Sequence, residues 1–206
     1  MSATVTRVVL ATRNQHKVVE LRHILSDVVE ELGLEIVGAS EFEGAPDVVE
    51  DEVTFEGNAR LKAVALARHT GLPALADDSG LAVDVLGGAP GIFSARWAGR
   101  HGDDLANLQL LLDQLADVKD EHRAAGFVCA AVLALPDGTL RSAEGHFRGT
   151  LAREPRGANG FGYDPLLVVE GDTRTAAELS PEEKNAISHR GKAFRAMVPH
   201  LRELLG

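Results

Sequence analysis

Residues 126–152, GFVCAAVLALPDGTLRSAEGHFRGTLA, distinguish a mixed β-sheet from a purely parallel one. Two strand-like runs flank the Pro-Asp-Gly sequence at residues 136–138, which is typical of the turn in a β-hairpin. The rest of the chain alternates strand-like and helix-like segments, the order of an α/β protein. An antiparallel hairpin within that order argues against a purely parallel, doubly wound sheet. We therefore predict a mixed central β-sheet flanked by helices.

The segments on either side of the hairpin are assigned by the spacing of their apolar residues. Strands are predicted over residues 7–12, 34–39, 72–78 and 165–169, and helices over residues 14–29, 54–70, 103–118 and 180–205. Thr54 is placed to cap one helix. Ser180, Pro181 and Glu183 form a capping box with proline at the first helical position. A loop at residues 187–192 is expected to interrupt the last helix, and residues 87–99 are too rich in Gly to be regular.

Length and composition describe a single folded unit, which we expect to be one domain over residues 1–206. A formal net charge of −10 argues against a nucleic acid polymer as partner. No run approaches the ~20 apolar residues of a membrane span. The first residues lack a secretory apolar region, so we expect a cytoplasmic protein. Cys129 lies in an apolar run and is expected to be buried rather than reactive.

The turn after the first strand reads LATRNQHK, residues 10–17, and is a candidate phosphate site. Free backbone N–H groups at a helix start attract phosphate, and Lys17 in the first helical turn adds a positive charge. The glycines of a Walker loop are missing. Asn14 as a plain helix cap is an equally good interpretation.

Two groups of carboxylates are candidates for binding a cation. Asp77 and Asp78 follow an apolar strand, and Glu50, Asp51 and Glu52 precede the second helix. Asp-Asp-Ser-Gly is also ordinary turn chemistry, and an acidic run before a helix is usually a solvated face. Taken together, these carboxylates supply the hard oxygen ligands that Mg²⁺ takes, with substrate phosphates completing the shell.

Two further turns are candidates for binding a base. PRGANGFGYDP, residues 155–165, lets backbone approach a ligand closely, and Phe161 either stacks on a base or fills the core. EKNAISHRGKA, residues 183–193, brings Lys184, His189 and Arg190 together. Basic residues concentrated in turns of an acidic chain favour a small anionic ligand.

Four motifs occur in order along the chain: residues 12–17 (TRNQHK), 76–99 (ADDSGLAVDVLGGAPGIFSARWAG), 160–165 (GFGYDP) and 177–193 (AELSPEEKNAISHRGKA). Together they resemble the noncanonical purine nucleoside triphosphate pyrophosphatases, the Ham1 or inosine triphosphatase family. The resemblance implies a Mg²⁺-dependent hydrolase that converts ITP, dITP and XTP to the monophosphate and pyrophosphate. It also implies a homodimer and an elongated α/β fold with a cleft between two lobes.

The resemblance also implies roles for individual residues. Glu50 and Asp78 would bind the metal, with Glu52 as the alternative if the turn is shifted. Asp78 would accept the proton of the attacking water, and Asp77, Lys17 and Lys62 would complete the catalytic set. The substrate would contact Thr12, Arg13, Asn14, Gln15, His16, Lys17, Ser79, Phe161, Gly162, Tyr163, Asp164, Lys184, His189 and Arg190.

Two other functions compete with this one. A Maf-type pyrophosphatase of other nucleotides is disfavoured by the ISHRGKA block, residues 187–193. A nucleotide sensor without turnover would not need Lys17, Lys62, Asp77 and Asp78 together.

Overall fold

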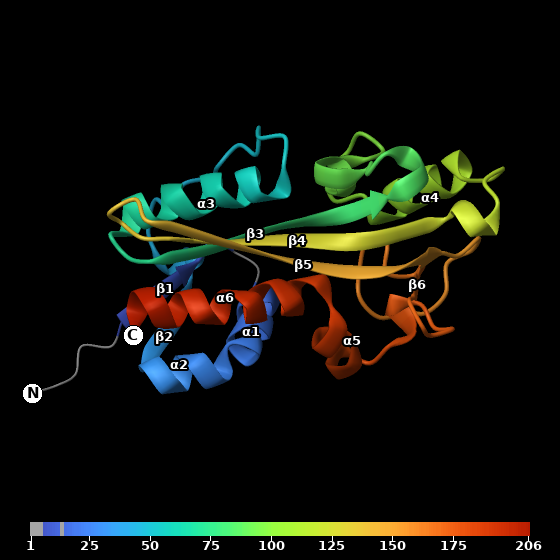
Figure 1. Ribbon diagram of the computed structural model, residues 1–206. Coiled ribbons are helices and arrows are strands. Elements are labelled where there is room, and N and C mark those ends of the chain that lie inside the picture. The colour runs from blue at the N-terminus through green and yellow to red at the C-terminus, as the bar shows by residue number, and fades with distance from the viewer. Residues whose placement is uncertain (1–5, 13–14) are drawn as a thin grey trace, which may run out of the picture. The chain divides into compact units, whose positions relative to one another are not determined.

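The computed structural model describes residues 6–12 and 15–206. Within the second range, only the backbone of residues 15–17 is described. In these residues the strands form a six-stranded sheet with the order β2-β1-β3-β4-β5-β6. The strands are β1 (Thr6–Leu10), β2 (Leu34–Gly38), β3 (Ala74–Val83), β4 (Ala124–Ala134), β5 (Leu140–Leu151) and β6 (Leu167–Val169). Strand β1 pairs in parallel with β2 and β3, whereas β5 pairs antiparallel with β6. The predicted mixed sheet is confirmed (Figure 1).

Helices cover the sheet. The helices are α1 (Gln15–Ile24), α2 (Ser26–Leu32), α3 (Phe55–Thr70), α4 (Asp104–Gln114), α5 (Pro181–Ile187) and α6 (His189–Leu205). The chain divides into two compact units. Unit 1 comprises the described residues up to Asp78 together with Ala130–Gly145 and Arg190–Gly206, and unit 2 comprises Ser79–Cys129 and His146–His189. The predicted cleft between two lobes stays a prediction.

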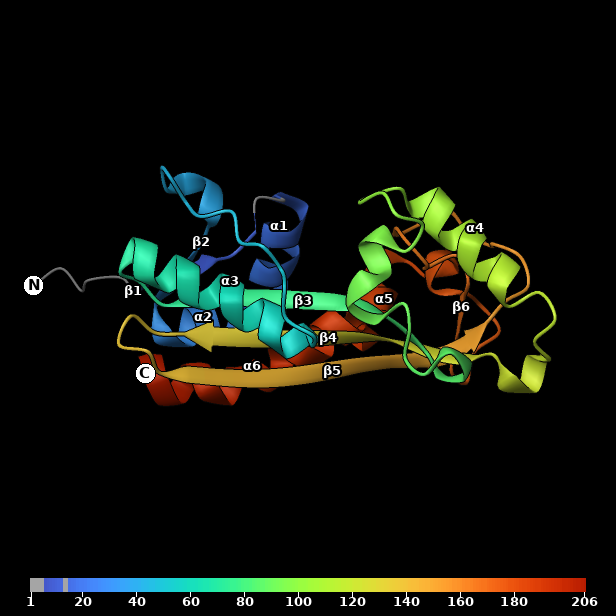
Figure 2. The same ribbon diagram turned by 90° about the horizontal axis from the view of Figure 1, so that it is seen from above.

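In unit 1, α3 lies on one face of the sheet, and α1, α2 and α6 lie on the other (Figures 1 and 2). The sheet-facing side of α3 carries Ala59, Ala63 and Ala67, which are at most 1% exposed and cluster with Val9 and Val37. Small side chains let the helix backbone approach the sheet closely. The helix that carries several candidate site residues is therefore held at a short distance from β3.

In unit 2, α4 and α5 lie on opposite faces of the sheet (Figure 1). Leu111 of α4 is fully buried in a cluster with Leu81 and Phe147. Arg123, only 1% exposed, donates to the backbone carbonyls of Leu115, Leu151 and Ala152 at 2.7–2.9 Å. Burial lowers the pKa of this guanidinium. Arg123 thus fastens the end of α4 to the end of β5.

The prediction that a strand ends at the two aspartates is wrong. Strand β3 continues through Asp77 and Asp78 to Val83. Turn chemistry is overridden here because β3 has β4 as its hydrogen-bonded neighbour in the sheet. Strand β1, by contrast, ends at Leu10, opposite Leu75. The aspartates therefore lie just beyond the end of β1.

Other boundaries also differ from the predictions. Residues 14–29 were predicted to form one helix, but α1 and α2 are separated at Leu25, whose ψ is 7°. A 3-10 helix, Gly91–Arg96, occupies part of the stretch predicted to be irregular. The predicted loop at residues 187–192 is reduced to a break at Ser188 between α5 and α6.

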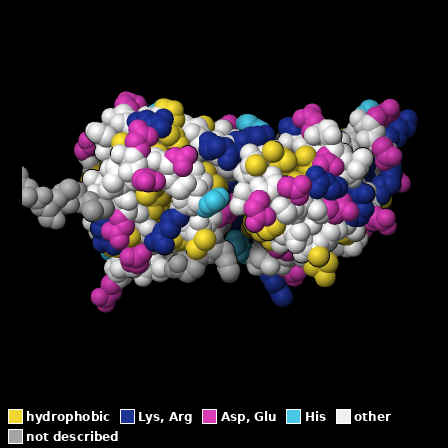
Figure 3. Space-filling view, turned by 90° about the horizontal axis from the view of Figure 1, so that it is seen from below, with side chains coloured by type: hydrophobic (Ala, Val, Ile, Leu, Met, Phe, Trp, Pro, Cys, Tyr) yellow, Lys and Arg dark blue, Asp and Glu magenta, His cyan; other side chains and the backbone are white. Residues whose placement is uncertain are grey.

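The caps and the hairpin are confirmed. The Thr54 side chain accepts from Gly57 N, and Ser180 forms the predicted capping box with Glu183. Residues 135–139 turn β4 into β5, with Leu135 N donating to Thr139 O at 2.9 Å. Within residues 6–12 and 15–206, no helix combines the length and apolar character needed to cross a bilayer. On the face in Figure 3, acidic and basic side chains are interspersed.

Candidate active site

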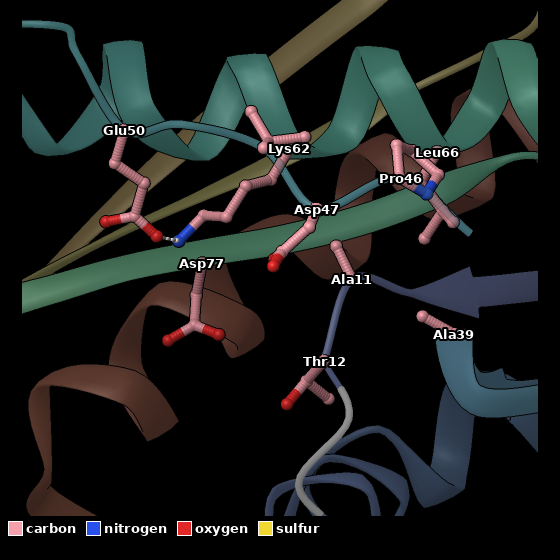
Figure 4. Close-up of a pocket in the computed structure, with 10 residues that line it drawn as sticks. Ala11, Thr12, Ala39, Pro46, Asp47, Glu50, Lys62, Leu66 and Asp77 are labelled. Atoms are coloured by element: carbon pink, nitrogen blue, oxygen red, sulfur yellow. Dashed lines mark hydrogen bonds and ion pairs between the residues drawn. The ribbon is translucent and has the colours of Figure 1, made fainter. Parts of the chain in front are cut away.

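Unit 1 contains a pocket of about 420 Å³ that opens beside β3 (Figure 4). Its lining combines apolar with charged and polar side chains: Ala11, Thr12, Ala39, Pro46, Asp47, Val48, Glu50, Lys62, Leu66 and Asp77. The loop between η1 (Ala39–Glu41) and α3 supplies one wall, and α3 and β3 supply others. The pocket can therefore hold a polar group such as a phosphate against a wall of small apolar side chains.

Among the described residues that line this pocket, Lys62 is the one with a positive charge, and two carboxylates converge on it. Its Nζ lies 2.9 Å from Glu50 Oε1 and 3.8 Å from Asp78 Oδ1. Helix α3 presents Lys62, the preceding loop presents Glu50, and β3 presents Asp78. The Lys62 side chain is 17% exposed and that of Asp78 is 14% exposed, so water screens this cluster only partly. Glu52, the alternative metal ligand, instead pairs with exposed Arg60 at 3.2 Å.

Asp78 has a second partner that the sequence interpretation missed. Asn58 Nδ2 donates to Asp78 Oδ2 at 3.1 Å, and Asn58 Oδ1 accepts from Glu52 N at 3.0 Å. Asn58 and Lys62 are four residues apart, so both project from the same face of α3. That spacing is the signal in the sequence that groups the two residues.

Asp77 is in contact with a buried arginine. Arg190 Nε lies 3.2 Å from Asp77 Oδ2, and Arg190 Nη1 lies 3.4 Å from Glu20 Oε2. The side chains of Arg190 and Asp77 are each 7% exposed. Arg190, a predicted substrate contact, thus joins the start of α6 to β3 and α1 within unit 1.

Only part of the first motif belongs to the described residues. Thr12 lines the pocket, and its backbone N–H donates to Leu10 O at 2.8 Å. Arg13 and Asn14 lie outside the described residues, as do the side chains of Gln15, His16 and Lys17. The phosphate-binding role of this motif stays a prediction.

Unit 2 contains a second group of predicted site residues. Asp164, 2% exposed, accepts from Lys184 Nζ at 2.5 Å and from Phe161 N at 2.8 Å. Phe161 is 63% exposed, and Lys184 Nζ lies 5.4 Å from the centre of its ring. A buried carboxylate therefore fixes both the lysine and the backbone of an exposed aromatic ring, with the lysine over one face of that ring.

Steric constraints explain why glycines are required at two positions of this loop. Gly160 has a φ of +75°, and a Cβ there would collide with the Asp164 carboxylate. Gly157 has a φ of +86°, and a Cβ there would collide with the backbone of Ala177. Gly162 N donates to Asp104 Oδ2 at 2.9 Å. The loop is thus held by close backbone approaches and by hydrogen bonds to two aspartates, as well as by the buried Tyr163.

The remaining predicted residues of unit 2 are more enclosed. The Tyr163 hydroxyl donates to Ser94 O at 2.9 Å, and burial raises the pKa of this phenol. The His189 ring is stacked on Phe127 with a centroid separation of 5.0 Å. Ser79, half-buried, directly follows Asp78 in β3. The contacts predicted between these three residues and a nucleotide stay predictions.

The donor set in unit 1 suits one kind of metal site. Within the described residues there is no cluster of three or more His, Cys, Asp or Glu side chains able to hold a metal. Glu50 and Asp78 nevertheless share the Lys62 ammonium, so their oxygens converge on one positive charge. Mg²⁺ is commonly held by one or two carboxylates, with substrate phosphates and water as the other ligands. The residues present fit that ion.

Known proteins resemble this chain over nearly all of its length. The model of the Ham1 family matches residues 8–200. A dITP/XTP pyrophosphatase of Streptomyces avermitilis is 68% identical over 98% of this chain and 100% of that protein. One of Streptomyces coelicolor is 67% identical over the same shares. The solved structure of a HAM1 protein from Coxiella burnetii has a TM-score of 0.88 at 43% identity and covers 97% of this chain and 100% of that chain. The chain therefore belongs to the Ham1 family.

Proposed function

We propose that this chain hydrolyses the noncanonical purine nucleoside triphosphates ITP, dITP and XTP to the monophosphate and pyrophosphate. Its similarity to dITP/XTP pyrophosphatases over 98% of its length supports this substrate class. The observation that carries the chemistry is the convergence of Glu50 and Asp78 on Lys62, which lines the unit 1 pocket. We further propose that residues 1–206 act as one functional domain.

The phosphate chain is assigned to the unit 1 pocket. We propose that Glu50 and Asp78 hold Mg²⁺, which supplies positive charge to the phosphate oxygens when bound. Lys62 is placed to neutralise the charge that develops on the pyrophosphate leaving group. Thr12 and the predicted phosphate motif, residues 12–17, would bind the rest of the triphosphate.

The attacking water is assigned to Asp78. Asp77 lines the pocket and its Oδ2 lies 3.2 Å from the buried Arg190 guanidinium, so this carboxylate completes the catalytic set by positioning rather than by accepting the proton. The Asp78 side chain is 14% exposed, so a water can approach it. A carboxylate fixed on a strand orients such a water and accepts its proton without forming a covalent intermediate.

The base is assigned to unit 2. The exposed ring of Phe161 offers a stacking surface, and Lys184 lies beside it as a hydrogen-bond donor. Hypoxanthine and xanthine carry an acceptor at the 6-position, where adenine carries an amino group. A donor left facing that amino group costs about 1–3 kcal/mol, which disfavours ATP.

The setting of the enzyme is also proposed. Its substrates are free nucleotides, so we place it in the cytoplasm with no membrane and no nucleic acid polymer as partner. We propose a homodimer, which sedimentation equilibrium would reveal as twice the mass of one chain. A species of monomer mass at micromolar concentration would contradict the dimer.

The proposed activity is tested by measuring pyrophosphate and orthophosphate release from ITP, XTP, dITP, dUTP, ATP and GTP, with and without Mg²⁺. We expect pyrophosphate from the first three nucleotides and only with Mg²⁺. Release of orthophosphate, or equal cleavage of ATP, would contradict the proposal. Cleavage confined to dUTP would favour a pyrophosphatase of other nucleotides, and tight binding of ITP without turnover would favour a sensor.

A further inference from the structure

Asn58 connects the backbone before α3 to the Asp78 carboxylate. It is 1% exposed and is placed in the first turn of α3, whose first residue is Phe55. Its Oδ1 accepts from Glu52 N at 3.0 Å and its Nδ2 donates to Asp78 Oδ2 at 3.1 Å. Both ends of the amide are therefore engaged, on two different segments of unit 1.

The orientation of this amide follows from its partners. The backbone N–H of Glu52 can only donate, so the atom facing it is the amide oxygen. The amide nitrogen is then turned toward Asp78, whose ionised carboxylate can only accept. Neither end tolerates the flipped amide.

We propose that Asn58 is a positioning residue that fixes the rotation of the Asp78 carboxylate for metal binding and catalysis; this inference rests on the proposed function. With Oδ2 held by Asn58, the other oxygen, Oδ1, faces Lys62 Nζ at 3.8 Å. Asn58 and Lys62 both come from α3, so a single helix orients both oxygens of Asp78. The two contacts restrain the carboxylate in one rotation.

Two variants separate the two halves of the Asn58 amide. Asn58→Leu removes both hydrogen bonds at similar volume. Asn58→Asp keeps an acceptor for Glu52 N and removes the donor to Asp78. Burial beside Asp78 would raise the pKa of the introduced carboxyl, so assays at about pH 9 are used to favour its ionised form.

Asn107 provides a matched control in unit 2. It is also 1% exposed, and its Oδ1 accepts from Ala98 N at 2.7 Å. Among the described residues its Nδ2 has no hydrogen-bond partner. Asn107→Leu and Asn107→Asp therefore make the same two substitutions at an equally buried asparagine that is outside the cluster of Glu50, Lys62 and Asp78.

The expected results differ between the two positions. Both Asn58 variants should lower kcat for ITP by about 10–100-fold, as for partners that orient metal ligands, with little change in KM. Mn²⁺ binding without nucleotide, followed by electron paramagnetic resonance, should weaken by about tenfold in Asn58→Leu. The Asn107 variants should retain the wild-type kcat and Mn²⁺ affinity.

Three results would overturn the inference. One is a wild-type kcat in Asn58→Asp beside a low kcat in Asn58→Leu, since Asn58 would then act through Glu52 alone. The second is an equal loss in the Asn107 variants. The third is wild-type Mn²⁺ binding in Asn58→Leu. If wild-type protein releases no pyrophosphate from ITP, the proposed function fails, and the Mn²⁺ isotherms alone then decide the role of Asn58.

Discussion

At Asp78, one carboxylate oxygen meets an amide and the other faces an ammonium. Asp78→Asn keeps the size of the side chain and an acceptor for Asn58, but it removes the negative charge. We expect kcat for ITP to fall by at least about 100-fold, because the proton acceptor and a metal ligand are lost together. Circular dichroism should be unchanged. Exposed Asp117, replaced by Asn, is the control. Comparable activity in Asp78→Asn would refute the assigned role.

The Arg190–Asp77 pair is a matter of stability. Arg190→Met withdraws the guanidinium from a carboxylate that is 7% exposed, and breaking a buried pair on one side costs about 3–5 kcal/mol. Urea unfolding should show this loss. The double variant Arg190→Met/Asp77→Asn should regain a large part of it, because no buried charge then remains at either position. A double variant no more stable than the single one would argue against this coupling.

The sequence predicted the identity of most site candidates but not their pairing. Asn58 and Lys62 are separated by one helical turn, so periodicity alone groups them. Arg190 and Asp77 are 113 residues apart, and no local pattern connects them. Arg190 pairs with Asp77 because both side chains are buried at the same place in the folded unit. Only the three-dimensional structure shows this.

Among the elements, α3 is the one on which the site depends. Its N-cap, Thr54, accepts from Gly57 N at 3.0 Å. Thr54→Ala should lower the free energy of unfolding by about 1 kcal/mol, because that N–H loses its acceptor. Thr54→Ser keeps the hydroxyl and should stay close to wild type. Urea titration measures both variants, and faster amide exchange at Gly57 in Thr54→Ala would locate the effect. Equal loss in both variants would show that the methyl group, not the cap, matters.

Carboxylates in and beside the segment before α5 should make the stability of the folded state depend on pH. Hydrogen bonds from Arg174 lower the pKa of Asp172 from its ordinary value of 3.8 to about 2. Backbone hydrogen bonding from Ser180, followed by Arg174, lowers the pKa of Glu183. Groups with a depressed pKa in the folded state stabilise it above their unfolded pKa, and this contribution is lost as the pH falls.

Arg174→Met should therefore flatten the fall of the thermal midpoint between about pH 4 and pH 2, the window set by Asp172. Thermal unfolding of wild type and variant across this range measures the difference. Parallel curves would show that Arg174 does not hold these carboxylates in solution.

Caps and periodicity explain why most elements could be predicted, and β3 explains the main failure. Thr54 and Ser180 are local signals that the fold obeys. The local sequence at Asp77, Asp78 and Ser79 favours a turn, but the structure has a strand there. Pairing with β4 extends β3 through these three residues. The separation of α1 from α2 at Leu25 has no signal of its own, since Leu25 is a buried leucine in an uninterrupted helical pattern.

For the whole molecule, binding of the substrate should raise the free energy of unfolding and therefore Tm. A ligand at a hundredfold excess over its Kd stabilises the folded state by about 2.7 kcal/mol. For a chain of this size that corresponds to a shift in Tm of about 5–10 °C. A non-hydrolysable ITP analogue with Mg²⁺ should produce this shift in differential scanning fluorimetry, and the ATP analogue should produce a smaller one. Equal shifts would locate recognition in the phosphates rather than in the base.

The arginine that fastens α4 to β5 has a consequence for genetics. Three nitrogens of the Arg123 guanidinium donate to three backbone carbonyls. A lysine, with a single ammonium nitrogen, cannot reproduce this arrangement. A random mutagenesis screen for inactive alleles would recover changes at Arg123 beside those at Asp78, although the two positions fail for different reasons. The Asp78 alleles would accumulate to normal abundance as inert protein. The Arg123 variant proteins would be present at low abundance because proteases degrade the unfolded chain. Each molecule that remains folded would nevertheless hydrolyse its substrate at the normal rate.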